Sequence, residues 1–290
     1  VASYIIYTIQ PRGAIQMIGD MQKWTPNVAG IIEHAREIHP KTEVISRLVS
    51  GEIHRTNYEE VCIRSRKLGS ALEKDGVKKG DVVATLALNT YRHLEMYYGI
   101  SGMGAITHTL NFRLHPEQAI YIINHAEDKI IFVELPFVPI LEGLQDKLAT
   151  VEKYIVLCEE GEMPESSLKN AISYEEYIKD GDENYDWPEL DDDAACALCY
   201  TSGTTGNPKG VLYSHKSNVI HAQAALTAMT IKPDDSILMV VPLFHVLAWG
   251  IPYFGPMNGL KLVMPGMQME GEPLYELIDK EDITLAFGVP

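Results

Sequence analysis

The sequence predicts an α/β protein with doubly wound sheets. Strand and helix patterns alternate along the chain with short connections, and residues 82–88 are almost continuously apolar. Such a run is typical of a strand that is buried on both faces of a parallel sheet. The chain has 290 residues, of which 46% are hydrophobic, so it can bury a substantial core as one large or two ordinary domains.

The first half of the chain shows the repeated order strand, helix, strand. The expected strands cover residues 43–48, 82–88, 105–110, 129–133 and 154–157. The expected helices cover residues 28–38, 93–100, 116–124 and 137–148, and Thr56 or Asn57 can cap a further helix that Gly76 ends. This alternation indicates a parallel sheet of the doubly wound type.

The charge of the chain excludes one broad class of function. A formal net charge of −16 argues against a general grip on nucleic acid, which depends on clustered lysine and arginine. An anionic ligand must then be bound locally, by backbone amides, a few basic side chains and a divalent cation. Part of the negative charge lies in residues 159–193, where we expect a mostly exposed acidic connector with one short helix at residues 174–177.

The number of cysteines and the distribution of apolar residues indicate where in the cell the protein is expected to be found. No run of about 18 uncharged apolar residues is present, which excludes a membrane-spanning helix. Four sparse cysteines favour a reducing, cytoplasmic setting. Cys196 and Cys199 form a Cys-x-x-Cys that resembles a redox pair or half a zinc site, but no second pair lies at metal spacing and the surrounding pattern is that of a buried strand. Residues 1–20 read as an extension to which we assign no role.

Residues 200–210 carry the strongest chemical signal. Their sequence, Tyr-Thr-Ser-Gly-Thr-Thr-Gly-Asn-Pro-Lys-Gly, stands between two short apolar runs that we expect to form a hairpin with the loop at its tip. Glycines let backbone N–H groups turn toward an anion, the hydroxyls add donors, and Lys209 adds a positive charge. The order Lys209-Gly210 differs from the P-loop, in which lysine follows glycine and precedes serine or threonine. A hairpin tip without a ligand is disfavoured, because this order of residues is unusual in a plain turn.

The pattern of strands and helices resumes after this loop. A helix begins at Ser214 or Ser217 and continues to Met229, and a short helix covers residues 273–278. Strands are expected at residues 236–240, 261–264 and 283–287. The sequence ends directly after the last strand, where an open α/β sheet would carry a ligand-binding loop, so we expect a truncated chain.

The 200–210 motif resembles that of the adenylate-forming, AMP-binding enzymes, which include acyl-CoA synthetases, firefly luciferase and the adenylation domains of peptide synthetases. Four further segments are similar to the fatty and short- to medium-chain acyl-CoA ligases, including the methylmercaptopropionate-CoA ligases; they are residues 89–98, 108–118, 121–128 and 241–250. The resemblance extends from about residue 21 to residue 290. It implies a partial AMP-binding domain with the phosphate loop at residues 200–210.

The resemblance implies a reaction and a set of binding residues. A fatty or short- to medium-chain carboxylic acid would be activated by ATP to acyl-AMP, with Mg²⁺, and transferred to coenzyme A. The phosphates would be held by Thr201, Ser202, Gly203, Thr204, Thr205, Gly206 and Lys209. Thr201 would also help to bind Mg²⁺, and Lys209 would contact the pyrophosphate. The expected partners are the acid, ATP and coenzyme A, and a homodimer is left open.

Two residues beyond the loop are candidates for the acid site. Taken alone, His245 reads as a core histidine, but the resemblance places it between the acyl pocket and the adenylate. Trp249 resembles a tryptophan that gates the fatty-acid tunnel in some long-chain acyl-CoA synthetases, with core packing as the alternative. Asn111 and Arg113 stay unassigned, because Phe112 stands where many relatives have proline.

Several elements of the family have no counterpart in this sequence, among them the adenine-binding segment with its glutamate and the C-terminal domain with its lysine. This chain alone is therefore not expected to run the whole reaction. Two alternatives remain open at this point. One is another adenylating enzyme, either luciferase-like or feeding a carrier protein, and the other is a non-catalytic nucleotide-binding module.

Overall fold

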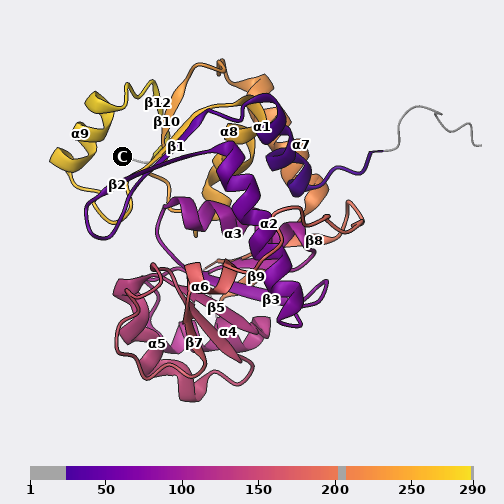
Figure 1. Cartoon of the computed structure of the whole chain (residues 1–290), viewed down its shortest axis with the longest axis vertical. Coiled ribbons are helices and arrows are strands. Elements are labelled where there is room, and N and C mark those ends of the chain that lie inside the picture. The colour runs from indigo at the N-terminus through magenta and orange to yellow at the C-terminus, as the bar shows by residue number, and fades with distance from the viewer. Residues whose placement is uncertain (1–23, 202–206, 289–290) are drawn as a thin grey trace, which may run out of the picture.

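The computed structural model describes residues 24–201 and 207–288. In these residues the chain builds two β-sheets, with helices packed between and around them (Figure 1). The larger sheet has seven strands in the order β7-β6-β5-β3-β4-β8-β9. They are β3 (Val82–Leu86), β4 (Ile106–Thr109), β5 (Ile130–Val133), β6 (Lys153–Val156), β7 (Ala171–Ser173), β8 (Ala195–Thr201) and β9 (Lys209–Ser214). All neighbours from β7 to β8 are parallel, and β9 is antiparallel to β8. The expected α/β class with doubly wound sheets is confirmed.

The second sheet has five strands in the order β12-β10-β11-β1-β2. They are β1 (Glu43–Arg47), β2 (Ile53–Asn57), β10 (Ser236–Leu238), β11 (Lys261–Met264) and β12 (Leu285–Ala286). The strand β1 pairs in parallel with β11, more than two hundred residues later in the chain, and in antiparallel with β2. The two sheets are therefore tied together by the chain path as well as by packing.

Nine α-helices accompany the sheets in the described residues. They are α1 (Val28–Ile38), α2 (Tyr58–Lys74), α3 (Tyr91–Gly102), α4 (Pro116–Ala126), α5 (Val138–Leu144), α6 (Tyr174–Ile178), α7 (His215–Ala228), α8 (Ile251–Asn258) and α9 (Gly271–Lys280). For α2 and α7 the sequence offered two possible N-cap residues each, and the structure shows which of them caps the helix. Asn57 caps α2 by accepting a hydrogen bond from the Glu60 amide at 3.0 Å, and Ser214 caps α7 by accepting one from the Ser217 amide at 3.1 Å.

Helix α3 lies at the centre of the molecule, between the two sheets (Figure 1), and every one of its residues is buried. Its polar side chains must therefore find partners inside the protein. His93 illustrates this: its Nδ1 donates to the Leu88 carbonyl, and its Nε2 accepts from the Thr85 hydroxyl, each at 3.0 Å. Burial lowers the pKa of His93 to about 4, so the ring is neutral. His93 begins the helix that was expected at residues 93–100, but its burial was not foreseen from the sequence.

The structure differs from the sequence-based prediction of secondary structure in three segments. The single helix expected at residues 137–148 is broken into α5 and two flanking 3₁₀ turns, Leu135–Phe137 and Gln145–Lys147, in a segment that holds two prolines. The polar strand β2 was not foreseen. The acidic segment 159–193 is largely exposed, as expected, but it also adds strand β7 to the large sheet and buries Leu168, Tyr174, Ile178 and Tyr185. Short strands with polar residues lack the alternation on which sequence prediction depends.

Glu134, directly after β5, is a buried carboxyl whose protonation should make the stability of the protein depend on pH. Its side chain is buried, and burial raises its pKa from 4.5 to about 7. In the folded protein this carboxyl keeps a proton that the unfolded chain releases above pH 4.5, so the free energy of unfolding should fall by up to about 3 kcal/mol as the pH rises through 7. Urea unfolding at about pH 5 and about pH 8 measures this loss. Glu134→Gln should remove most of it, and an equally steep loss in that variant would contradict the assignment.

No helix in residues 24–201 or 207–288 is both long enough and apolar enough to cross a membrane.

Candidate active site

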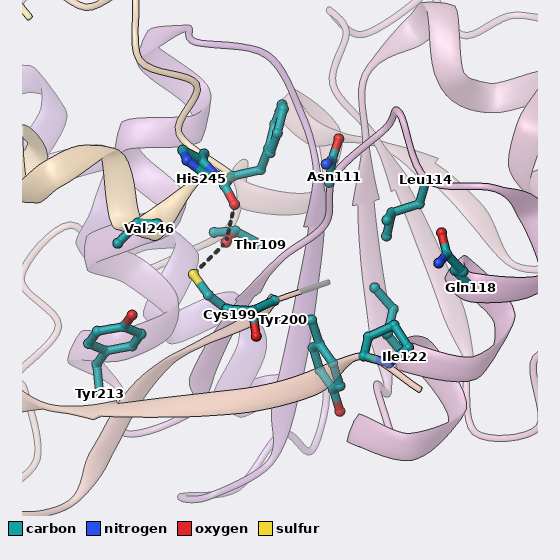
Figure 2. Close-up of a pocket in the computed structure, with 13 residues that line it drawn as sticks. Thr109, Asn111, Leu114, Gln118, Ile122, Cys199, Tyr200, Tyr213, His245 and Val246 are labelled. Atoms are coloured by element: carbon teal, nitrogen blue, oxygen red, sulfur yellow. Dashed lines mark hydrogen bonds between the residues drawn. The ribbon is translucent and has the colours of Figure 1, made fainter. Parts of the chain in front are cut away.

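A cavity of about 230 Å³ opens where the β8–β9 hairpin meets β4, α4 and the segment after β10 (Figure 2). In Figure 2, His245 and Val246 form one wall, and Leu114, Gln118 and Ile122 face them from the side of α4. The cavity is lined by Thr109, Asn111, Leu114, Gln118, Ile122, Cys199, Tyr200, Thr201, Pro208, Tyr213, Phe244, His245 and Val246. The wall on the side of α4 is thus largely apolar, and the wall formed by the β8–β9 hairpin carries the hydroxyl groups of Tyr200, Thr201 and Tyr213.

The expected hairpin is confirmed. In the β8–β9 pair Thr201 stands opposite Lys209, so these two predicted phosphate-binding residues lie together at the tip, and both are exposed. Thr201 also lines the cavity, whereas Lys209 lies beside it on the neighbouring strand. The remaining loop predictions, Ser202, Gly203, Thr204, Thr205 and Gly206, lie outside the described residues. Lys209 has no ion-pair partner within residues 24–201 and 207–288.

His245 is exposed and lines the cavity, so the alternative of a buried core histidine is wrong. It precedes an unusual turn, Val246–Gly250, in which Val246, Leu247, Ala248 and Trp249 all have φ between 42° and 55°. This left-handed conformation costs an L-residue about 1–2 kcal/mol, and proteins hold it only where the surroundings enforce it. The turn brings Val246 to the cavity next to His245.

Trp249, the proposed gating residue, lies at the end of this turn. Its side chain is 37% exposed, so it is not a fully packed core residue, and it is not among the residues that line the cavity. Its carbonyl accepts a hydrogen bond from Nε2 of His221 on α7 at 3.4 Å. The structure therefore places Trp249 next to the site but outside the cavity wall.

The walls of the cavity are joined by buried hydrogen bonds of Thr109, which the sequence alone did not indicate. The hydroxyl of Thr109 on β4 lies 3.4 Å from the Phe244 carbonyl and 3.3 Å from Sγ of Cys199 on β8 (Figure 2). Thr109 therefore connects both sides of the cavity floor. Burial raises the pKa of the Cys199 thiol, which stays protonated and serves as a packing group. Cys62, Cys158 and Cys196 are likewise free and buried, in keeping with the interpretation of Cys196 and Cys199 as strand residues.

Tyr200, at the base of the loop, is fixed by two histidines that sequence reasoning did not assign. Its hydroxyl lies 2.6 Å from Nδ1 of His125, and its ring lies 5.1 Å from the ring of His108. His108 lies on β4 and is completely buried, and its Nδ1 is 2.8 Å from the buried carboxylate of Asp128. Both histidines belong to segments that resemble the family, but only the fold brings them to Tyr200. Asn111, also unassigned, lines the cavity and accepts a hydrogen bond from the Arg113 amide at 2.9 Å.

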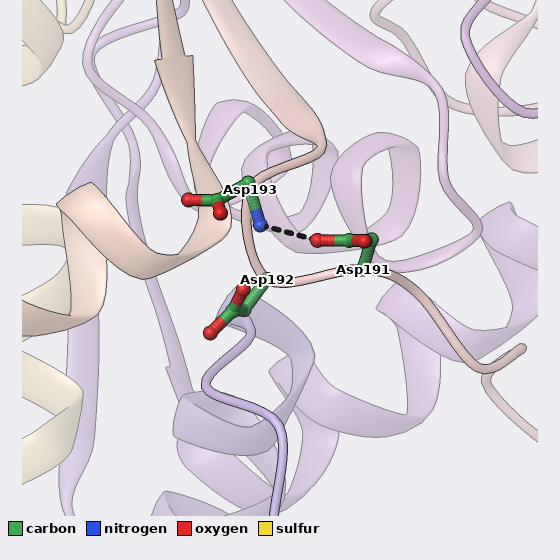
Figure 3. Close-up of side chains that lie close together, drawn as sticks. All are labelled: Asp191, Asp192 and Asp193. Carbon is green, nitrogen blue, oxygen red and sulfur yellow. Dashed lines mark hydrogen bonds between the residues drawn. The ribbon is translucent and has the colours of Figure 1, made fainter. Parts of the chain in front are cut away.

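Three consecutive carboxylates, Asp191, Asp192 and Asp193, lie close together just before β8 (Figure 3). Their local contacts account for the cluster. The Asp191 carboxylate accepts from the Asp193 amide at 2.9 Å, and the Lys216 ammonium pairs with Asp192 at 2.8 Å and with Asp193 at 3.0 Å. The cluster closes the turn between the acidic segment and the sheet.

The model of the AMP-binding enzyme family matches residues 32–290 of this sequence. The chain belongs to this family. Among curated AMP-binding relatives, the medium-chain-fatty-acid–CoA ligase of Ectopseudomonas oleovorans is 45% identical over 276 residues, which cover 94% of this chain and 50% of the relative. The 3-methylmercaptopropionyl-CoA ligase of Ruegeria pomeroyi is 44% identical, with 94% and 51% covered. The long-chain-fatty-acid–CoA ligase of Thermus thermophilus is 42% identical, with 91% and 48% covered. The chain therefore spans about half the length of these relatives.

Solved AMP-binding structures share the fold. An anthranilate CoA ligase in complex with anthranoyl-AMP superposes with a TM-score of 0.81 at 23% identity, over 90% of this chain and 49% of that one. The inhibitor-bound N-terminal domain of FACL13 from Mycobacterium tuberculosis gives a TM-score of 0.78 at 24% identity, over 91% of this chain and 63% of that domain. The two sheets described here are thus the fold of the N-terminal domain of adenylate-forming enzymes.

Proposed function

We propose that this AMP-binding chain activates a fatty or other small apolar carboxylic acid as acyl-AMP, in an enzyme that transfers the acyl group to coenzyme A with release of AMP and pyrophosphate. The observation that carries this proposal is the single cavity that joins Thr201, at the tip of the hairpin, to His245 and an apolar wall. A phosphate-binding end and an acyl-binding end are what a carboxylate-activating site needs. The names of the acyl-CoA ligase relatives support the same class of substrate.

The chemistry assigns a role to each end of the cavity. The substrate carboxylate attacks the α-phosphate of ATP, the bond to the leaving pyrophosphate breaks, and negative charge accumulates on that leaving group. Lys209 and the loop amides would stabilise this charge. His245 would donate a hydrogen bond to the carboxylate or the α-phosphate. It is not needed as a general base, because a carboxylic acid is already ionised at neutral pH.

Mg²⁺ prefers oxygen ligands and is usually bound through one or two carboxylates together with substrate phosphates and water. Of these ligands, the described residues that line the cavity offer the hydroxyl oxygen of Thr201 but no carboxylate. Thr201 would thus hold the ion jointly with the phosphates of ATP. The ion would supply further neutralisation of charge on the pyrophosphate.

Trp249 is proposed to limit the length of the acyl chain. Trp249 lies four residues after His245 at the end of the left-handed turn, and its partly exposed ring would restrict the space beyond the cavity into which an acyl tail extends. Trp249→Ala should therefore shift the preferred chain length of the acid toward longer substrates. The ratio of kcat/KM values for short, medium and long acids measures the shift. An unchanged profile would reduce Trp249 to a packing residue.

The function is tested by acyl-CoA formation with a panel of acids of different length and polarity, in the protein with any sequence beyond Pro290 included. Formation of acyl-CoA and AMP from an apolar acid is the expected result. Acylation of a carrier protein in place of coenzyme A would assign the chain to another branch of the family. ATP binding without turnover of any acid would overturn the proposal in favour of a nucleotide-binding module.

Two properties of the whole protein are also proposals. The four free cysteines support a reducing, cytoplasmic location, in which thiols persist. A homodimer is a hypothesis that light scattering of the purified protein can decide.

A further inference from the structure

The left-handed turn Val246–Gly250 needs support from its surroundings, because each of its four consecutive L-residues carries a steric cost in this conformation. Within the turn the Ala248 amide donates to the His245 carbonyl at 2.8 Å, and at its end the Ile251 amide donates to the Ala248 carbonyl. The turn lies between the buried ends of β10 and α8, so the residues that bind its two flanks decide where His245 and Val246 stand.

Asn89 binds the flank that precedes the turn. Its amide nitrogen donates to the carbonyls of Met239 at 2.7 Å and Val241 at 2.8 Å, and its side-chain oxygen accepts from the Leu243 amide at 2.7 Å. Asn89 is buried, and these three bonds use both of its donors and its acceptor. The backbone from residue 239 to residue 243 is thereby fixed in the approach to His245.

Two consecutive tyrosines of α3 bind both flanks. The Tyr97 hydroxyl donates to the Leu243 carbonyl, two residues before His245, and the Tyr98 hydroxyl donates to the Pro252 carbonyl, two residues after Gly250. Both tyrosines are completely buried, on a helix whose every residue is buried. The segment 89–98, which the proposed reaction does not use, thus supplies three side chains that hold the turn from either side.

We propose that Asn89, Tyr97 and Tyr98 are positioning residues that hold the left-handed turn and so direct His245 and Val246 into the cavity. None of the three lines that cavity, so each acts through the backbone of residues 239–252. Their effect on the position of His245 is independent of the reaction, whereas their effect on rate depends on the proposed function.

The chain contains a matched control for the two tyrosines. Tyr253 is also buried, its ring lies 5.9 Å from Tyr97 and 6.3 Å from Tyr98, and its hydroxyl has no hydrogen-bond partner among the described residues. Replacing each tyrosine by phenylalanine keeps the ring and removes only the oxygen. Tyr97→Phe and Tyr98→Phe therefore each remove one restraint on the turn, and Tyr253→Phe removes none.

The first measurement follows the imidazole of His245 by NMR in histidine-labelled protein, with His245→Gln to assign its signal. Tyr97→Phe, Tyr98→Phe and Asn89→Ala are expected to shift or broaden this signal, and Tyr253→Phe should leave it in place. An unmoved His245 signal in folded Tyr97→Phe and Tyr98→Phe would overturn the inference, as would an equal shift in Tyr253→Phe. Circular dichroism checks folding, and the two tyrosine variants decide the matter if Asn89→Ala unfolds.

The second measurement is ATP–pyrophosphate exchange with an apolar acid. The positioning role predicts a loss of about tenfold or more in kcat for Tyr97→Phe and Tyr98→Phe, since displacement of a group at the reacting centre by about 1 Å can cost up to about 100-fold. The KM for ATP should change little, because the loop that binds its phosphates is not touched. If the unmodified protein shows no exchange with any acid, the proposed function fails, and the NMR result still decides the positioning role.

Discussion

Lys209→Ala is expected to lower the rate of ATP–pyrophosphate exchange by about 10²- to 10³-fold, the loss typical of removing one group that stabilises charge in a transition state. Lys209 stands opposite Thr201 at the tip of the hairpin, exposed and with no ion-pair partner in the described parts of the chain. Its charge is therefore available to a ligand. Charge on the pyrophosphate grows as the bond to the α-phosphate breaks, so the loss should appear mainly in kcat.

Two variants control this prediction. Lys209→Arg keeps a positive charge at the tip and should retain more of the rate than Lys209→Ala, although its guanidinium has a different shape. Lys169→Ala removes an exposed lysine that pairs with Asp146 and lies just before β7, at the edge of the large sheet opposite β9, and it should leave the rate unchanged. Exchange at the unmodified rate in Lys209→Ala would show that Lys209 does not stabilise the leaving group.

Most strands of the sheets could be predicted because each has a recognisable hydrophobic pattern in its own short stretch of sequence. β3 and β5 are nearly continuous apolar runs, as burial on both faces requires, and Gly80 marks the turn before β3. β2 and β7 have no such hydrophobic pattern, since β2 is polar and β7 has only three residues. Their strand conformation depends on the partners β1 and β6, and the sequence does not show that these partners are close.

The candidate site likewise contains residues that could be predicted from the local sequence and residues that could not. The phosphate-binding role of Thr201 and Lys209 is a prediction from residue types and local spacing, and the hairpin that brings them together was foreseen. The assignment of His245 needed a family resemblance, because a histidine between aromatic and aliphatic residues has no chemical signature of its own. The contact from His125 to Tyr200 and the restraint by Asn89 could not be predicted, as they join residues 75 and about 150 positions apart.

The largest effect on stability is expected for Arg64→Met. The Arg64 guanidinium donates to the Glu95 carboxylate at 2.7 Å and to Glu175 at 2.9 Å, and the Glu95 side chain is fully buried in α3. Removing Arg64 leaves Glu95 with the Tyr174 hydroxyl, 2.8 Å away, as its side-chain partner. A buried charge that loses its partner typically costs about 3–5 kcal/mol, so urea unfolding should show a loss of this size in the free energy of unfolding.

The pH dependence and a double variant separate this cost from lost packing. Burial already raises the pKa of Glu95, and removing Arg64 should raise it further, so the loss in Arg64→Met should grow as the pH rises and shrink as Glu95 takes up a proton. Adding Glu95→Gln removes the charge and should restore part of the stability. A loss that is independent of pH and unchanged in the double variant would mean that Arg64 contributes through its packing alone. The same ion pairs join α2 and α3 to α6, so charge, as well as the parallel pairing of β7, attaches the acidic segment to the core.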